Sequence, residues 1–180
     1  MRWLVLATSL NVACATASSI DDDLDAASQR DGSPTTDAAP ADAPPIDAAP
    51  IACEGGDINV VDPGSGHCYM VFNTNRNWNG ASSSCNTLGN GAHLVTIFDA
   101  TENQVVRNLR AGKFWIGAAD VATEGNFVWV TGETINSTFE NWDGGEPNNS
   151  GNEDCAEMRD NLTWNDGDCP DTQPYVCERP

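Results

Sequence analysis

Residues 155–180 have the sequence CAEMRDNLTWNDGDCPDTQPYVCERP, and this stretch constrains the fold more than any other. It contains Cys155, Cys169 and Cys177, three of the seven cysteines in a chain of 180 residues. That count is high for a reducing cytosol and is typical of exported, disulfide-bonded proteins. Between the cysteines lies the polar sequence Trp164-Asn165-Asp166, which places two oxygen-bearing side chains directly after a large aromatic one.

The chain is strongly acidic. It has 27 Asp and Glu residues against 8 Lys and Arg, a formal net charge of −19. This charge argues against binding nucleic acid or an anionic membrane surface, because both require clustered basic residues. It favours Ca²⁺, a hard cation that prefers oxygen ligands. The negative charge is spread along the chain, with a net charge of −6 in residues 1–52 and −13 in residues 53–180.

The first 17 residues are typical of an export signal, since Arg2 precedes a short apolar stretch and small residues follow. Two modes of processing fit. Cleavage after Ala17 would release a secreted protein. Alternatively, lipidation of Cys14 would make a surface lipoprotein. Cys14 is the odd cysteine, since the other six can form pairs among themselves. We therefore expect an exported protein that is either secreted or anchored at the cell surface, with contact to a membrane only through such a lipid.

Residues 18–52 are rich in Asp, Ala, Pro, Ser and Thr and show no hydrophobic periodicity. Such a composition cannot bury enough apolar surface to offset chain entropy, so we expect a disordered, extended linker. The remaining residues, 53–180, hold six of the seven cysteines and five of the six tryptophans, and we expect them to form one domain.

The pattern within residues 53–180 predicts an α+β domain. Two helices are expected, one near Trp78–Leu88 and one beginning after Asp99, where Glu102 would close a capping box. Short strands separated by Gly- and Asn-rich turns are expected at four places: His67–Phe72, Phe114–Gly117, Asn126–Val130 and Pro174–Cys177.

The stretch Gly132–Cys155 has little periodicity and is rich in Asn, Gly and Asp. A loop of this length in a small domain is usually functional. It and the Trp164 region together carry five hard-oxygen side chains, Glu146, Asn148, Glu153, Asn165 and Asp166. If the disulfides bring the two segments together, these residues have the right chemistry for a Ca²⁺ site.

Several short motifs occur in one order along the domain. They are Trp78-x-x-Ala81-x-x-x-Cys85, Gly91-Ala92-His93-Leu94-Val95-Thr96-Ile97, Trp115-Ile116-Gly117, Glu146-Pro147-Asn148, Glu153-Asp154-Cys155, Trp164-Asn165-Asp166 and Tyr175-Val176-Cys177-Glu178. In this order the chain from Cys53 to Pro180 resembles the C-type lectin domain in its long form, and it is similar to mannose-binding proteins.

Six cysteines allow fifteen pairings, among which the residues alone do not choose. The resemblance implies three bridges, Cys53–Cys68, Cys85–Cys177 and Cys155–Cys169. It implies a fold with two helices, small antiparallel sheets and a long Ca²⁺-binding loop. It also implies that Pro147 follows a cis peptide bond.

The resemblance further implies that one Ca²⁺ and two neighbouring sugar hydroxyls are held by the five side chains Glu146, Asn148, Glu153, Asn165 and Asp166. The order of acid and amide in Glu146-Pro147-Asn148 is the family's mark for mannose, glucose, N-acetylglucosamine and fucose. A weaker auxiliary Ca²⁺ site is implied at Asp120, Glu124, Asn149 and Asp154.

We therefore expect Ca²⁺-dependent carbohydrate binding. The alternative is a module that binds proteins or other surfaces through the same fold without sugar specificity. We do not expect an enzyme, because the sequence has only two histidines and lacks the common metalloprotease, hydrolase and phosphate-binding motifs. The sequence does not determine the oligomeric state or the source of the glycan.

Overall fold

The computed structural model describes residues 52–137 and 139–180. The expected export signal, Cys14 and nearly all of the expected linker lie outside these residues. Within the described part of the chain, no helix has the length and apolar character needed to cross a membrane.

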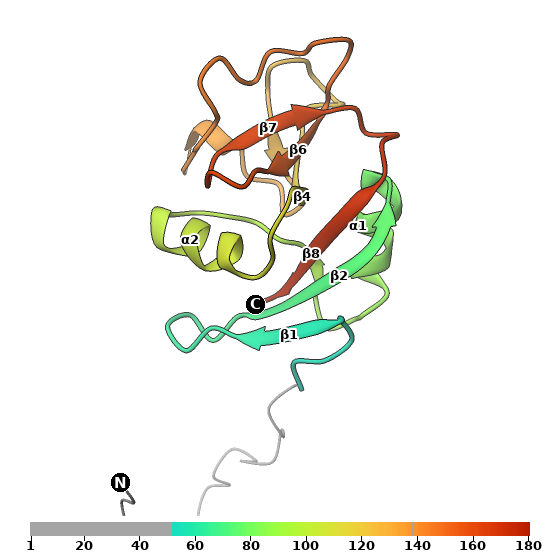
Figure 1. The fold of residues 1–180 in the computed structure, drawn as a ribbon, viewed down its shortest axis with the longest axis vertical. Coiled ribbons are helices and arrows are strands. Elements are labelled where there is room, and N and C mark those ends of the chain that lie inside the picture. The colour runs from blue at the N-terminus through green and yellow to red at the C-terminus, as the bar shows by residue number, and fades with distance from the viewer. Residues whose placement is uncertain (1–51, 138) are drawn as a thin grey trace, which may run out of the picture. The chain divides into compact units, whose positions relative to one another are not determined.

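Eight strands and two α-helices make up the described domain (Figure 1). The strands are β1 (Ile58–Val61), β2 (Cys68–Arg76), β3 (His93–Leu94), β4 (Phe114–Ala119), β5 (Val128–Trp129), β6 (Cys155–Met158), β7 (Trp164–Gly167) and β8 (Gln173–Arg179). The helices are α1 (Trp78–Asn86) and α2 (Ala100–Asn108), with a short 3₁₀ turn at Ile135–Ser137. The α+β fold is thus confirmed.

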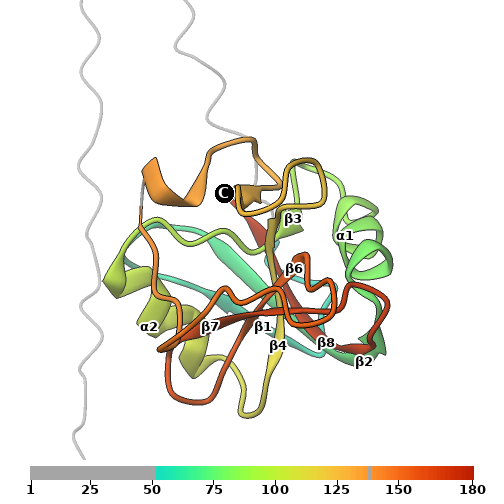
Figure 2. The same ribbon diagram turned by 90° about the horizontal axis from the view of Figure 1, so that it is seen from above.

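The strands form one hydrogen-bonded sheet in the order β1-β2-β8-β4-β6-β7, with β3 beside β8 and β5 beside β4. All pairs are antiparallel except β4 and β8, which run parallel. The sheet is therefore more continuous than the small separate sheets that we expected. Figure 2 shows α1 and α2 on opposite sides of the central strands.

All four expected strands are present, although β5 is shorter than expected and β2, β4 and β8 are longer. The pattern missed β1, β3, β6 and β7. The sequence of β7 is Trp-Asn-Asp-Gly, and β1 is exposed along its whole length. Neither shows the alternation of apolar and polar residues that identifies a strand, because tertiary pairing holds both in place.

Both helices begin at a capping side chain. Asn77 accepts a hydrogen bond from the backbone N–H of Gly80, and Asp99 accepts from Thr101 and Glu102. The expected capping box differs in one detail. The Glu102 carboxylate accepts from the N–H of Phe98 at 2.8 Å, one residue before the cap, so it holds the chain that enters α2.

Two clusters of buried side chains form the core, and alternate residues of β2, β4 and β8 belong to opposite clusters, so one lies on each side of the sheet. Trp115 and Ile116 are fully buried. In the segment expected as the strand Asn126–Val130, Val130 is 37% exposed and Val128 is half-buried. Phe127 and Trp129 are both buried, because alternate residues of a strand face the same side.

Three disulfides join Cys53 to Cys68, Cys85 to Cys177 and Cys155 to Cys169. These are the pairs that the family resemblance implied. The Cys85–Cys177 bridge links α1 to β8 across 92 residues. By closing so long a loop, it contributes roughly 4–5 kcal/mol in the chain-entropy model.

Gly117 lies where two backbone segments approach β4 closely. Its N–H donates to the Val95 carbonyl at 2.7 Å, and its own carbonyl accepts from Val130 N–H at 2.7 Å. A Cβ at this position would lie 2.6 Å from the carbonyl oxygen of Leu94. Because the obstacle is backbone, it cannot rotate away. This explains the glycine in the Trp115-Ile116-Gly117 motif.

We therefore expect Gly117→Ala to lower the free energy of unfolding by roughly 2–3 kcal/mol through overpacking. Gly144→Ala is the matched control, since a Cβ there would have no heavy atom within 4 Å. Urea unfolding of both variants with the disulfides intact measures the difference. Equal stabilities would contradict this account of the motif.

Candidate functional site

The loop between the 3₁₀ turn and β6 is anchored on Trp164, the first residue of β7. The Trp164 side chain is fully buried and packs edge-on against Phe139 and Trp142 of the loop, at centroid distances of 5.6 and 5.8 Å. The Trp164 backbone accepts a hydrogen bond from Asp143 N–H at 2.8 Å and donates to the Asn141 carbonyl at 2.8 Å. An irregular polar loop is thereby fixed beside a strand. Figure 1 shows β6 and β7 together at one end of the domain.

Asp166 connects the same strand to the tip of the loop. Its side chain is fully buried, and its two oxygens accept the backbone N–H groups of Asn148 at 3.2 Å and Asn149 at 2.7 Å. A buried carboxylate requires such donors, because an ionised group without partners is costly to remove from water. Asp166 therefore positions the loop residues that carry the other expected ligand oxygens.

The loop tip brings three of the expected residues together. The peptide bond between Glu146 and Pro147 is cis, as expected. The side-chain amide of Asn148 donates to the Glu146 carboxylate, so an acceptor and a donor lie side by side. The N–H of Ser150 donates both to Asn148 Oδ1, at 2.8 Å, and to Glu153 Oε2, at 3.1 Å. Glu146 and Glu153 are half-buried, whereas Asn148 is exposed.

Asn165 is the fifth expected residue, and it is buried. Its side-chain amide donates to the Asp166 carbonyl and to Glu157 Oε1, the latter at 3.3 Å. Glu157 is 2% exposed and also accepts from Lys113 Nζ at 2.9 Å. No local pattern indicates Glu157 and Lys113, because the sequence of β6, the strand that pairs Glu157 with Asn165, does not predict a strand.

The electrostatics of this group favour a cation. Burial raises the pKa of the Glu146 carboxyl. A side-chain hydrogen bond with Asp166 and the charge on Asp166 raise this pKa further. Arg159 lowers this pKa by a smaller amount. Two carboxyl groups thus compete for ionisation in the same place.

The four residues of the expected auxiliary set lie beside Asp166. Burial raises the pKa of Asp120, and the charges on Asp154 and Asp166 add to it. Partial desolvation and the charges on Asp120, Asp154 and Asp166 likewise raise the pKa of Glu124. Asn149 differs in that its Oδ1 accepts from Glu153 N–H at 2.8 Å, and this holds the loop together.

One buried oxygen in this second group has no partner among the described residues. Asp120 is 2% exposed, and its Oδ2 accepts from Gly125 N–H at 2.7 Å, whereas Oδ1 has no hydrogen-bond partner there. Such an orphaned oxygen next to other carboxylates is suited to a hard cation. The donor chemistry of both groups therefore fits Ca²⁺.

The fold and this oxygen-rich loop define a small disulfide-bonded binding domain. Residues 74–179 match the family model described as "Lectin C-type domain". The chain belongs to the C-type lectin domain family.

Three relatives illustrate the range of this similarity. "C-type lectin domain family 4 member M" of Nomascus concolor is 39% identical over 119 residues, which are 64% of this chain and 29% of that protein. The "Alpha-N-acetylgalactosamine-specific lectin" of Patiria pectinifera is 39% identical over 128 residues, 63% of this chain and 74% of that lectin. The crystal structure of the C-type lectin CEL-I from Cucumaria echinata has a TM-score of 0.58 at 32% identity, covering 62% of this chain and 89% of CEL-I.

The position of Asp166 yields a prediction about the loop. Replacing Asp166 by Ala removes both acceptors for the N–H groups of Asn148 and Asn149, and hydrogen bonds to charged groups contribute about 1.5–3 kcal/mol each. We expect amide hydrogen exchange at these two positions to accelerate by at least about tenfold, while α1, α2 and β2 remain protected.

Asp168→Ala is the control, because Asp168 lies two residues away and is exposed. Exchange measured residue by residue by NMR separates the two variants. Unchanged protection at Asn148 and Asn149 in Asp166→Ala would contradict the positioning role.

Proposed function

We propose that this domain binds carbohydrate in a Ca²⁺-dependent manner and prefers sugars with neighbouring equatorial hydroxyls, such as mannose, glucose, N-acetylglucosamine and fucose. The residues that would hold the ion and the sugar are Glu146, Asn148, Glu153, Asn165 and Asp166. One observation carries the proposal. The Glu146 acceptor and the Asn148 donor lie side by side, and the backbone of Asn148 is held by the buried Asp166.

Each side chain has a definite part in this scheme. When bound, Ca²⁺ would take one lone pair from each of two neighbouring sugar hydroxyls. Glu146 and Glu153 carry acceptor oxygens for the protons of those hydroxyls. Asn148 and Asn165 carry N–H donors for the remaining lone pairs. Asp166 keeps the loop in position and supplies negative charge, since it accepts the backbone N–H groups of Asn148 and Asn149.

The preference for mannose-type sugars rests on the order of acceptor and donor. The Patiria pectinifera lectin is named for N-acetylgalactosamine, so overall identity does not separate the two sugar classes. In this chain an acid precedes an amide at positions 146 and 148. A sugar whose hydroxyls match this direction of hydrogen bonding gains affinity, whereas the reversed arrangement leaves polar groups unpaired.

We further propose that the protein is exported, and that an anchor at Cys14 with the linker 18–52 displays the domain at a cell surface. A single small polar site binds one sugar weakly, because little area is buried. Several copies anchored in one membrane would bind a multivalent glycan with higher avidity.

A glycan array tests both parts of the proposal. We expect binding to mannose-type glycans with Ca²⁺ and its loss in excess chelator. Binding that persists in chelator would show that calcium is not required. The double variant Glu146→Gln with Asn148→Asp keeps the formal charge and reverses donor and acceptor, so the ratio of galactose to mannose binding should rise at least about tenfold. An unchanged ratio would contradict the assigned direction.

The proposed site also predicts a response to acid. A carboxyl group must be ionised to hold the metal, and the raised pKa values of Glu146 and Asp120 mean that protons compete above the ordinary carboxyl range near pH 4. Sugar binding at sub-millimolar Ca²⁺ should therefore be strongest at neutral pH and fade between roughly pH 6 and pH 4.5, since such modules bind Ca²⁺ weakly.

A titration of sugar binding against pH at two Ca²⁺ concentrations distinguishes competition from unfolding. Tenfold more Ca²⁺ should move the midpoint to lower pH. Coincident midpoints would show that the acid effect has another cause.

A further inference from the structure

A second polar cluster, formed by His67, Glu102 and Glu178, lies apart from the loop site. His67 directly precedes β2, Glu102 is on α2 and Glu178 is on β8. Figure 1 shows β1, together with the end of β2 that follows it, toward the opposite end of the domain from β6 and β7. Among the described residues, this is the one group of three His, Cys, Asp or Glu side chains whose ligand atoms all lie within 4.8 Å of one another.

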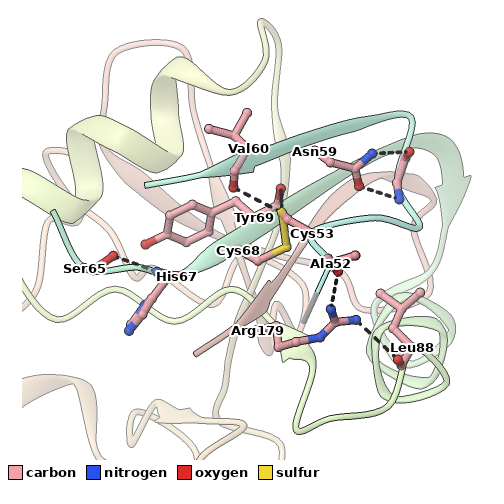
Figure 3. The surroundings of a disulfide bond; sticks show 11 residues. Ala52, Cys53, Asn59, Val60, Ser65, His67, Cys68, Tyr69, Leu88 and Arg179 are labelled. Carbon is pink, nitrogen blue, oxygen red and sulfur yellow. Dashed lines mark hydrogen bonds between the residues drawn. A yellow bond between two sulfur atoms is a disulfide. The ribbon is translucent and has the colours of Figure 1, made fainter. Parts of the chain in front are cut away.

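The geometry of His67 is unusual for a simple ion pair. Its Nδ1 lies 2.6 Å from Glu178 Oε1 and 3.8 Å from Glu102 Oε1. Nδ1 is shielded from solvent, yet it has no aligned hydrogen-bond partner within the described residues. His67 Nδ1, Glu178 Oε1 and Glu102 Oε1 thus lie close together, but no aligned hydrogen bond joins the imidazole to either carboxylate. Figure 3 shows His67 next to Cys68, whose disulfide with Cys53 tethers this part of the backbone.

Surrounding donors hold both carboxylates so that one oxygen of each faces the imidazole. Glu178 Oε2 accepts from the N–H and the hydroxyl of Thr96, at 3.0 and 2.9 Å. Glu102 Oε2 accepts from Phe98 N–H at 2.8 Å, and Glu102 Oε1 accepts from the Tyr69 hydroxyl at 2.9 Å. Outer partners of this kind orient the ligands of a metal ion.

The cluster carries unbalanced negative charge at partly buried positions. Glu178 is 1% exposed. Burial raises the pKa of Glu102, and the charge on Glu178 raises it further. A divalent cation between the two carboxylates would neutralise both.

We propose that His67, Glu102 and Glu178 form a Zn²⁺ site that is separate from the calcium-type loop site. Imidazole nitrogens and Asp or Glu carboxylate oxygens are both zinc ligands, and sites with three protein ligands keep water in the fourth position. An imidazole ligand favours zinc over Ca²⁺, which takes oxygen ligands. A pocket of about 460 Å³ lined by His67, Tyr69, Phe98 and Glu102 opens onto the cluster and provides an entry path for the ion.

The bound ion ties three separate elements together, namely the β1–β2 turn, α2 and β8. It stabilises the domain because the unfolded chain does not bring these ligands into one place. This site does not depend on the proposed sugar binding. Its failure and that of the lectin function are therefore distinguishable.

The experiment uses the ¹⁵N-labelled full chain, titrated with ZnCl₂ in the presence of millimolar Ca²⁺ to occupy the oxygen sites. Long-range ¹H–¹⁵N spectra resolve the two nitrogens of each imidazole, and the chain has two histidines. We expect one equivalent of Zn²⁺ to shift His67 Nδ1 and to leave both nitrogens of His93 unchanged. If His67 and the glutamates form only an ion pair, the His67 Nδ1 resonance will not shift when Zn²⁺ is added. That result, which needs no variant, overturns the proposal.

Two matched variants extend the test. Competition with a chromophoric chelator should show Zn²⁺ affinity at least about 100-fold weaker in His67→Gln, and unchanged affinity in His93→Gln. Glycan binding in Ca²⁺ should be the same in both. Equal Zn²⁺ affinity in the two variants would place the ion elsewhere and overturn the assignment.

Discussion

The polar end of this domain depends on the burial of Trp164. Its indole packs against Phe139 and Trp142 and also contacts Trp129 edge-on at 5.6 Å, while its Nε1 donates to Asn103 on α2 at 2.8 Å. Its backbone also pairs with residues 141 and 143. Burying an aromatic residue of this size stabilises the domain by several kcal/mol, which is enough to order a loop that has little apolar surface of its own. Asn165 and Asp166 follow directly, so the anchor and the site share one strand.

Electrostatic repulsion is the second constraint. Burial raises the pKa values of Glu146 and Asp120. The charge on Asp166 raises both further, and the charge on Asp154 adds to the shift of Asp120. At the opposite end, Glu102 and Glu178 face each other across His67. In both places the backbone and hydroxyl donors satisfy some oxygens and leave others available. A cation relieves the repulsion, and for this reason both clusters are suited to metals, although their ligand types select different ones.

Much of the fold was predictable from the sequence because strong local signals agreed with one another. The expected cap Asp99 lies at the start of α2, and the apolar positions of β4 and β8 are buried. The strands β6 and β7 were not predictable. Their residues include Glu157, Asn165 and Asp166, and these polar side chains are buried only because Lys113, backbone N–H groups and one another satisfy them.

The sequence by itself determined the helices, the family and the residue types that suit calcium, because these depend on local periodicity and on the order of short motifs. The family resemblance implied that the loop oxygens share one site, but only the tertiary structure decided which donors each oxygen accepts. Asp166 lies 18 residues from Asn148 in the chain and hydrogen-bonds to it, and His67 lies more than one hundred residues from Glu178 and contacts it. Contacts of such separation come from strand pairing and disulfide closure, and no local pattern encodes them.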